Sequence, residues 1–81
     1  MALTLRQQLR AARAMLGWSQ ADLAERSGIS KPTIARMEIG DGRLTGRHET
    51  VMELQGAIEK GGVEFVPENG GGPGVRLRRK K

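Results

Sequence analysis

The sequence contains no cysteine, only two aromatic residues and no long hydrophobic run. Without cysteine the chain can form neither disulfides nor thiolate metal sites. Because Trp18 and Phe65 are the only aromatic side chains, the core has to be built from Leu, Ile, Val, Met and Ala, which suits small packed helices. No stretch approaches the roughly 18 apolar residues that a membrane-spanning helix needs, and MALTLRQQLR at the start lacks the apolar region of a signal peptide. We therefore expect a cytoplasmic protein with no membrane partner.

Residues suited to catalysis or metal binding are also scarce. His48 is the only histidine, and a position at the surface or at a helix start suits it better than a metal site. The segment GGGPG is followed by no Gly-Lys-Ser/Thr and by no helix, so it does not match a phosphate-binding loop. We expect no enzymatic activity, no metal and no cofactor.

The positive charge is distributed unevenly along the chain. The formal net charge is +5, and residues 76–81, RLRRKK, hold five of the 14 basic residues. The rest of the chain then has 9 basic and 9 acidic residues, so this neutral body can attract DNA only if its charges are sorted by face. The expected contact surface is the central stretch with Lys31, Arg36, Arg43 and Arg47.

Local patterns predict four helices within residues 1–62. Apolar residues recur at spacings of three and four, serines that can act as caps precede two of the segments, and glycines follow the segments. The expected helices cover residues 4–16, 19–27, 31–39 and about 46–60.

Residues 63–78 have a different pattern, which predicts a β-hairpin. Val63 and Phe65, and then Val75 and Leu77, alternate with polar residues at the period of a strand. The intervening PENGGGPG cannot be helical and contains the Asn-Gly pair that turns favour. A lone two-stranded ribbon is marginal in water, so either the helices or a partner ribbon must cover its apolar residues.

The segment QADLAERSGISKPTIARM meets the requirements of two short helices joined by a tight turn. Ala24 is small where the helices would cross, and Gly28 falls at the turn, where glycine most easily supplies a positive φ. Ile34 and Met37 are apolar where the pair must rest on the remaining helices. Together these features predict a helix-turn-helix whose second helix stands out from the body.

Residues 5–60 resemble the Cro/phage-repressor-type helix-turn-helix family, also called XRE-type, and GWSQADLAERSGISKPTIARMEIG matches its motif throughout. The resemblance implies a mainly α fold, a compact four-helix lambda-repressor-like domain over residues 1–62. The chain lacks the family's usual fifth helix, which carries a common dimer interface. Its C-terminal segment resembles the ribbon of a bacterial subgroup.

The resemblance also implies roles for individual residues. The helix that begins at Lys31 would be the recognition helix in the major groove of DNA. Gln20 would contact a backbone phosphate and support the first recognition residues. Arg13 would pair with Glu38, a structural contact.

The chemistry of the expected recognition helix favours contact with DNA. Lys31 and Arg36 carry donors suited to guanine or phosphate, and Thr33 can contact phosphate or bases. Pro32 is tolerated in the first turn because its missing N–H has no intrahelical partner there, which leaves the other free N–H groups available to a phosphate. The expected DNA-binding residues are Gln20, Ser30, Lys31, Pro32, Thr33, Arg36, Arg43 and Arg47.

Because one recognition helix reads only a few base pairs, we expect a homodimer on a palindromic operator. The hairpin of residues 63–78 is the expected dimerisation element, since an exposed edge strand can pair with its symmetry mate and bury Phe65. The basic tail, residues 79–81, is expected to add nonspecific attraction to phosphates. The expected dimerisation residues are Val63, Phe65, Val75 and Leu77.

The sequence thus predicts a sequence-specific regulator of transcription that binds double-stranded DNA and is nucleoid-associated when bound. Two alternatives remain open. The chain could be the antitoxin of a toxin-antitoxin pair, with the C-terminal segment bound to a toxin and the helices repressing their own operon. It could also be a protein-interaction module that has kept the helical bundle without DNA binding.

Overall fold

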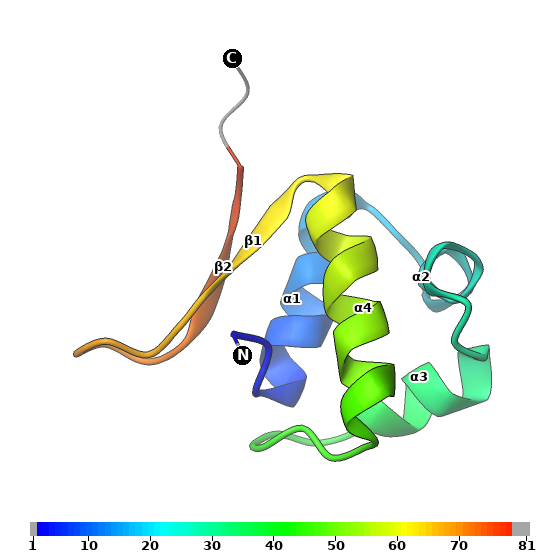
Figure 1. The fold of residues 1–81 in the computed structure, drawn as a ribbon, viewed down its shortest axis with the longest axis horizontal. Coiled ribbons are helices and arrows are strands. Elements are labelled where there is room, and N and C mark those ends of the chain that lie inside the picture. The colour runs from blue at the N-terminus through cyan, green and yellow to red at the C-terminus, as the bar shows by residue number, and fades with distance from the viewer. Residues whose placement is uncertain (1, 79–81) are drawn as a thin grey trace.

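The structure is a computed structural model of the 81-residue chain, and it describes residues 2–78. Within these residues the chain forms four helices and then one two-stranded antiparallel sheet (Figure 1). The predicted fold class, mainly helical with a C-terminal β-hairpin, is confirmed. The predicted basic tail, residues 79–81, lies outside the described residues. The elements are α1 (Arg6–Leu16), α2 (Gln20–Ser27), α3 (Lys31–Glu38), α4 (His48–Gly61), β1 (Val63–Val66) and β2 (Gly74–Leu77).

Short-range capping contacts set the two ends of α2. The Ser19 hydroxyl accepts a hydrogen bond from the Asp22 N–H (3.0 Å), and the Asp22 carboxylate accepts one from the Ser19 N–H (2.9 Å). These bonds satisfy backbone donors that a helix start leaves without a partner. Gly28 ends the helix in the left-handed conformation, with a φ of 77°, which glycine adopts without steric cost. Both predicted ends of α2 are confirmed.

The last helix starts two residues later than predicted. It begins at His48, because Gly46 has a φ of 147° and Arg47, the N-cap residue, is extended with φ −64° and ψ 145°. Neither conformation continues a helix. The loop between α3 and α4 therefore reaches from Ile39 to Arg47, and it is longer than the sequence indicated.

One apolar core joins the helices and the sheet. Its side chains come from the inward faces that the helical spacing predicted. In the first helical segment the apolar residues at spacings of three and four are Leu5, Leu9, Ala12 and Leu16. Leu9 and Ala12 are buried, whereas Leu5 and Leu16 at the two ends are only half-buried. Each helix supplies at least one fully buried side chain, among them Leu9, Leu23, Ile34, Leu54 and Ile58.

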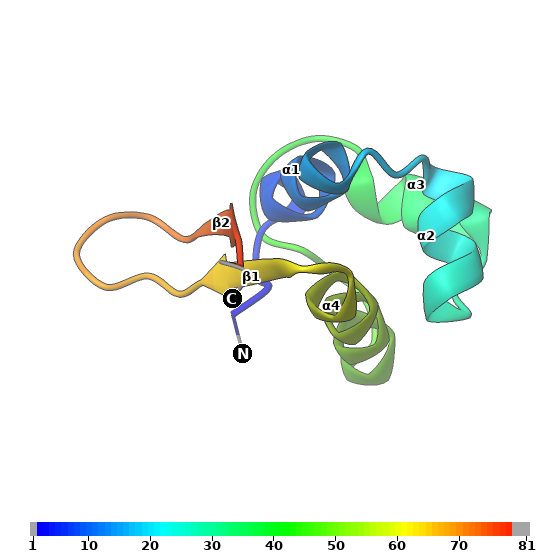
Figure 2. The same ribbon diagram turned by 90° about the horizontal axis from the view of Figure 1, so that it is seen from above.

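The two-stranded ribbon rests with one face on the helices of its own chain. Val63 and Phe65 of β1 are 0% and 6% exposed, and they pair with Leu77 and Val75 of β2. β1 packs against α4 and α1, and β2 against α1, while the connecting loop projects away from the helices (Figure 2). Phe65 is therefore already buried within one chain, which corrects the prediction that pairing of two ribbons buries it.

Gln8 ties the start of α1 to the ribbon, a contact that the sequence pattern did not indicate. Its side-chain oxygen accepts hydrogen bonds from the N–H groups of Thr4 (2.8 Å) and Leu5 (2.9 Å). Its side-chain nitrogen donates to the carbonyls of Ala2 and Gly74, both at 3.0 Å. Since Gln8 is only 3% exposed, these bonds satisfy a buried amide and fix the ribbon by polar as well as apolar contacts.

Two kinds of feature are missing from the described part of the chain. No helix in residues 2–78 is long and apolar enough to cross a membrane. The same residues contain no group of three or more His, Asp or Glu side chains placed to hold a metal ion.

Two glycines of α4 provide a matched test of the packing at its end. Gly56→Ala is expected to stabilise the fold by about 0.5–1 kcal/mol, because glycine weakens an exposed helix interior and a Cβ there meets no atom within 4 Å. Gly61→Ala is expected to destabilise it by about 1–3 kcal/mol, because its Cβ would lie 2.7 Å from the Trp18 ring. Thermal unfolding followed by circular dichroism measures both. Melting temperatures that rise equally would contradict the close packing of Trp18 on Gly61.

Candidate nucleic-acid interface

The helix pair α2 and α3 has the arrangement of a helix-turn-helix. Ala24 of α2 is half-buried against the core, so α3 can approach α2 closely, and Gly28 makes the left-handed turn between them. Ile34 and Met37 hold the inner face of α3 in the core, with 0% and 6% of their surface exposed. The opposite face of α3 is left to solvent (Figure 1).

The exposed face of α3 carries the residues that the sequence predicted to contact DNA. Lys31, Pro32 and Arg36 are exposed, and Thr33 is half-buried. The Ser30 hydroxyl caps the helix by accepting from the Thr33 N–H (3.3 Å) and donates to the Thr33 hydroxyl (2.9 Å). The Arg36 guanidinium donates to that same hydroxyl at 3.3 Å. These hydrogen bonds pre-order a polar surface of donors along one side of the helix, the type of surface that base edges and phosphates accept from.

A hollow of about 470 Å³ lies between α3, the following loop and the start of α4. Arg36 of α3 and Arg47 at the N-cap of α4 line it together with Thr33, Thr45 and Thr50. Two arginines and three threonines thus line this hollow, and such side chains are common donors to a nucleic-acid phosphate. The structure thus brings Arg36 and Arg47, predicted as separate contacts, to one hollow.

Arg43, the other predicted phosphate contact, lies elsewhere on the loop. It is exposed, and its backbone forms an isolated antiparallel bridge with Leu5, just before α1. It lines a different hollow, together with His48 at the start of α4. Arg43 and Arg47 are therefore on the same loop but not in one cluster.

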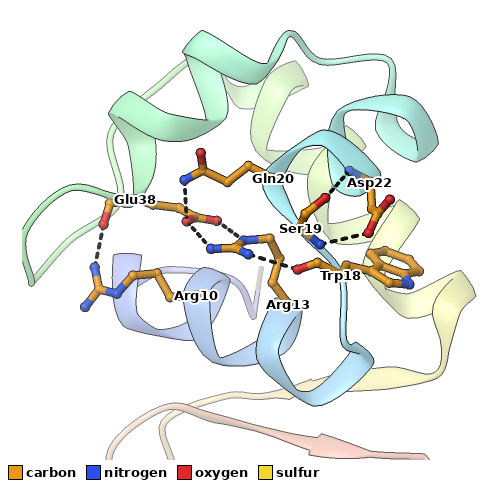
Figure 3. A network of polar contacts seen from close by, with 7 residues as sticks. All are labelled: Arg10, Arg13, Trp18, Ser19, Gln20, Asp22 and Glu38. Atoms are coloured by element: carbon orange, nitrogen blue, oxygen red, sulfur yellow. Dashed lines mark hydrogen bonds and ion pairs between the residues drawn. The ribbon is translucent and has the colours of Figure 1, made fainter.

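The ion pair predicted between Arg13 and Glu38 is present (Figure 3). The Arg13 guanidinium donates two hydrogen bonds to the carboxylate, both 2.7 Å long, and a third to the Trp18 carbonyl at 2.9 Å. Glu38 is 4% exposed, and Gln20 donates to the same carboxylate at 3.0 Å. The network joins α1, the start of α2 and the last residue of α3, and so fixes α3 to the body at its C-terminal end.

The Glu38 network shifts the pKa values of both members of the ion pair. Burial of the Glu38 carboxyl opposes ionisation, but hydrogen bonds from Arg13 and Gln20 and the charges of Arg13 and Arg10 outweigh burial, and they lower the pKa of Glu38. The hydrogen bond to Glu38 raises the pKa of Arg13 against the opposing effect of burial. Both side chains are therefore charged at neutral pH.

In this conformation the Gln20 side chain donates a hydrogen bond to Glu38, with its amide nitrogen turned toward the carboxylate (Figure 3). It is half-buried at the first position of α2. A phosphate contact of Gln20 stays a prediction, and the hydrogen bond to Glu38 is an additional role that the sequence pattern did not indicate.

Two further arginines of α1, which the sequence pattern did not indicate, reach the end of α3. Arg6 and Arg10 donate to backbone carbonyls of α3 and of the loop after it. Arg6, Arg10 and Arg13 follow one another at spacings of four and then three residues, which places all three on one side of a helix. This spacing is the sequence feature from which their shared role could have been predicted.

Comparison with known families agrees with this geometry. Residues 9–48 match the family described as Helix-turn-helix. The match runs from the second turn of α1 to the first residue of α4, and includes all of α2, the turn and α3. The comparison with curated proteins finds no match.

Proposed function

Because the chain belongs to the Cro/phage-repressor-type (XRE-type) helix-turn-helix family, whose members are DNA-binding regulators, we propose that it reads a specific DNA sequence as a homodimer. The single observation that carries this proposal is the outer face of α3. Lys31 and Arg36 are exposed there, while Ile34 and Met37 anchor the opposite face in the core. Donors held rigidly on a projecting helix are what readout of the major groove requires.

In this proposal α3 enters the major groove with its N-terminal end toward the bases. Lys31 and Arg36 donate to guanine or to nearby phosphates, and Thr33 contacts a phosphate or a thymine methyl. Ser30 and the first-turn N–H groups beyond Pro32 receive a phosphate, which the positive end of the helix dipole attracts.

The regions beside α3 supply the phosphate contacts that set its register on the duplex. Arg47 lies beside Arg36 at the 470 Å³ hollow, and Arg43 is exposed on the same loop. Gln20 completes the set from the first turn of α2, next to α3. Contacts to phosphates contribute affinity and orientation, but they carry little sequence information.

A second copy would give the specificity that one short helix cannot supply. α3 has eight residues and can read only a few base pairs, so two half-sites about one helical turn apart form the economical operator. Leu77 is 58% exposed on β2 and pairs with Val63 at the end of the ribbon away from its connecting loop. This exposed apolar side chain is the basis for proposing that two copies dimerise through the ribbon. A two-fold axis through the ribbon makes the operator palindromic.

Selection of bound duplexes from a random DNA pool tests the proposal. The wild-type chain is expected to enrich a palindromic motif. The double variant Lys31→Ala, Arg36→Ala is expected to bind that motif more weakly, by about 1–3 kcal/mol for each side chain that no longer reaches a base. The control Arg26→Ala, Lys60→Ala removes the same charge from α2 and α4 and should keep the preference. A chain that enriches no motif, as a protein-interaction module would, contradicts the proposal.

A further inference from the structure

The recognition helix ends differently from the other helices of the described chain. α1, α2 and α4 each end at a left-handed glycine, namely Gly17, Gly28 and Gly62. At the end of α3 stands Ile39, which is extended with φ −72° and ψ 131°. A helix end leaves its last carbonyls without intrahelical partners, and a glycine turn normally satisfies some of them. At the end of α3 the Arg36 carbonyl accepts from the Ile39 N–H at 3.4 Å, whereas the carbonyls of Met37 and Glu38 accept from arginine side chains of α1.

Arg6, in the first turn of α1, supplies one set of donors. Its guanidinium donates to the carbonyls of Met37 (2.7 Å) and Arg36 (3.2 Å) in the last turn of α3. It also donates to the Thr45 hydroxyl at 2.8 Å. One side chain thus joins α1, the end of the recognition helix and the loop before α4.

Arg10, one turn further along α1, supplies the second set. Its guanidinium donates to the carbonyl of Glu38 (Figure 3). It also donates to the carbonyl of Gly40 and forms an ion pair with Asp41 at 2.7 Å. We call Arg6 and Arg10 the arginine clasp. A cation at a helix C-terminus also interacts favourably with the helix dipole.

The clasp restrains the part of the fold that has the weakest intrinsic preference for one conformation. α3 has only eight residues, and helices this short depend on tertiary contacts for their stability. The loop after it contains Gly40, Gly42 and Gly46, all with positive φ, so its backbone is permissive. Arg43 and Arg47, the proposed phosphate contacts, lie on this loop.

From this geometry we infer that Arg6 and Arg10 are positioning residues for DNA reading: without touching DNA, they set the orientation of α3 and of the α3–α4 loop. The inference rests on the proposed function. It goes beyond the Arg13–Glu38 pair, because the acceptors are backbone carbonyls of α3 and the loop. The competing reading is that both arginines contact DNA phosphates directly.

The charge-preserving variant Arg6→Lys, Arg10→Lys separates these two readings. A lysine can replace an arginine as a point charge on a phosphate, but it lacks the planar fork that bonds several carbonyls at once. If the clasp positions α3, affinity for the selected motif falls by about tenfold, the cost of roughly one misplaced base contact. Affinity for random duplex DNA should fall much less than affinity for the motif, because nonspecific attraction to phosphates depends on the number of positive charges, which the variant keeps, more than on the exact placement of α3 and the loop. Arg26→Lys is the control.

Hydrogen exchange supplies a readout that needs no DNA. In the Lys variant, amides of residues 38–46 are expected to exchange faster than in the wild type, while those of α2 and α4 keep their protection. The single variants Arg6→Lys and Arg10→Lys, measured in the same way, remain informative if the double variant unfolds. If the wild type enriches no motif, the proposed function fails, and exchange alone then tests the clasp. The inference would be overturned if the Arg6→Lys, Arg10→Lys variant bound the motif as tightly as the wild type, or if its amides in residues 38–46 exchanged at the wild-type rate.

Discussion

The variant Arg13→Ala is expected to lose about 3–5 kcal/mol of unfolding free energy, because it leaves a buried carboxylate without its cation. Glu38 is 4% exposed, and two of the three hydrogen bonds to its carboxylate come from Arg13. Gln20 alone cannot neutralise the charge. Since small domains have only about 5–15 kcal/mol in total, the variant should be marginally folded at room temperature. Urea unfolding followed by circular dichroism measures the loss.

Two controls identify the cause of this loss. Asp41→Ala breaks the ion pair with Arg10. The side chains of Arg10 and Asp41 are 37% and 73% exposed, and exposed ion pairs contribute only about 0–1 kcal/mol to stability. The double variant Arg13→Met, Glu38→Leu removes both charges of the buried pair, a change that is often neutral or stabilising. It should therefore be clearly more stable than Arg13→Ala. If Arg13→Ala costs no more than Asp41→Ala, the pair is not buried as the structure describes.

The sequence was informative where a local pattern has only one structural meaning. The Ser19 and Asp22 spacing identified the N-cap of α2, and the glycine at position 28 identified its end. The apolar spacing in α3 and α4 identified the buried faces. The start of α4 was predicted at Gly46 and lies at His48. A glycine before a helix does not show at which residue the extended backbone of the preceding loop ends.

Apart from the hydrogen bond of Gln20 to Glu38, the contacts that sequence reasoning missed are made mainly with backbone groups. Arg6, Arg10 and Gln8 bond mainly to carbonyls and N–H groups of residues distant in the sequence or across a cap. Nearly every residue carries these backbone groups, so the residue type at the partner position does not indicate such a contact. Arg13 was found because its partner, Glu38, is a side chain of opposite charge in a known motif.

The ribbon illustrates the limit of periodicity in a different way. Alternation showed that Val63 and Phe65 share an apolar face, but it could not show what covers that face. The structure assigns it to α1 and α4 of the same chain. A deletion of residues 63–81 would therefore remove part of the core, and a loss of binding by such a chain would not report on dimerisation.

Two point variants separate the structural role of the ribbon from the proposed dimer contact. Phe65→Ala is expected to lose about 3–5 kcal/mol of unfolding free energy through the cavity it leaves in the core. Leu77→Lys should keep the fold, because Leu77 is 58% exposed, but it places a charge on the proposed contact between two copies. Thermal unfolding and sedimentation equilibrium of both variants supply the measurements.

Under ribbon-mediated dimerisation, the Leu77→Lys chain sediments as a folded monomer and binds an isolated half-site as well as the wild type does. Its affinity for the full palindrome falls toward that of the half-site, because the second recognition helix is no longer tethered to the first. Arg76→Lys is the neighbouring control, since it keeps the charge that pairs with Glu64 and should leave the dimer intact. A Leu77→Lys chain that remains dimeric would place the two-fold contact elsewhere, while leaving the reading by α3 unaffected.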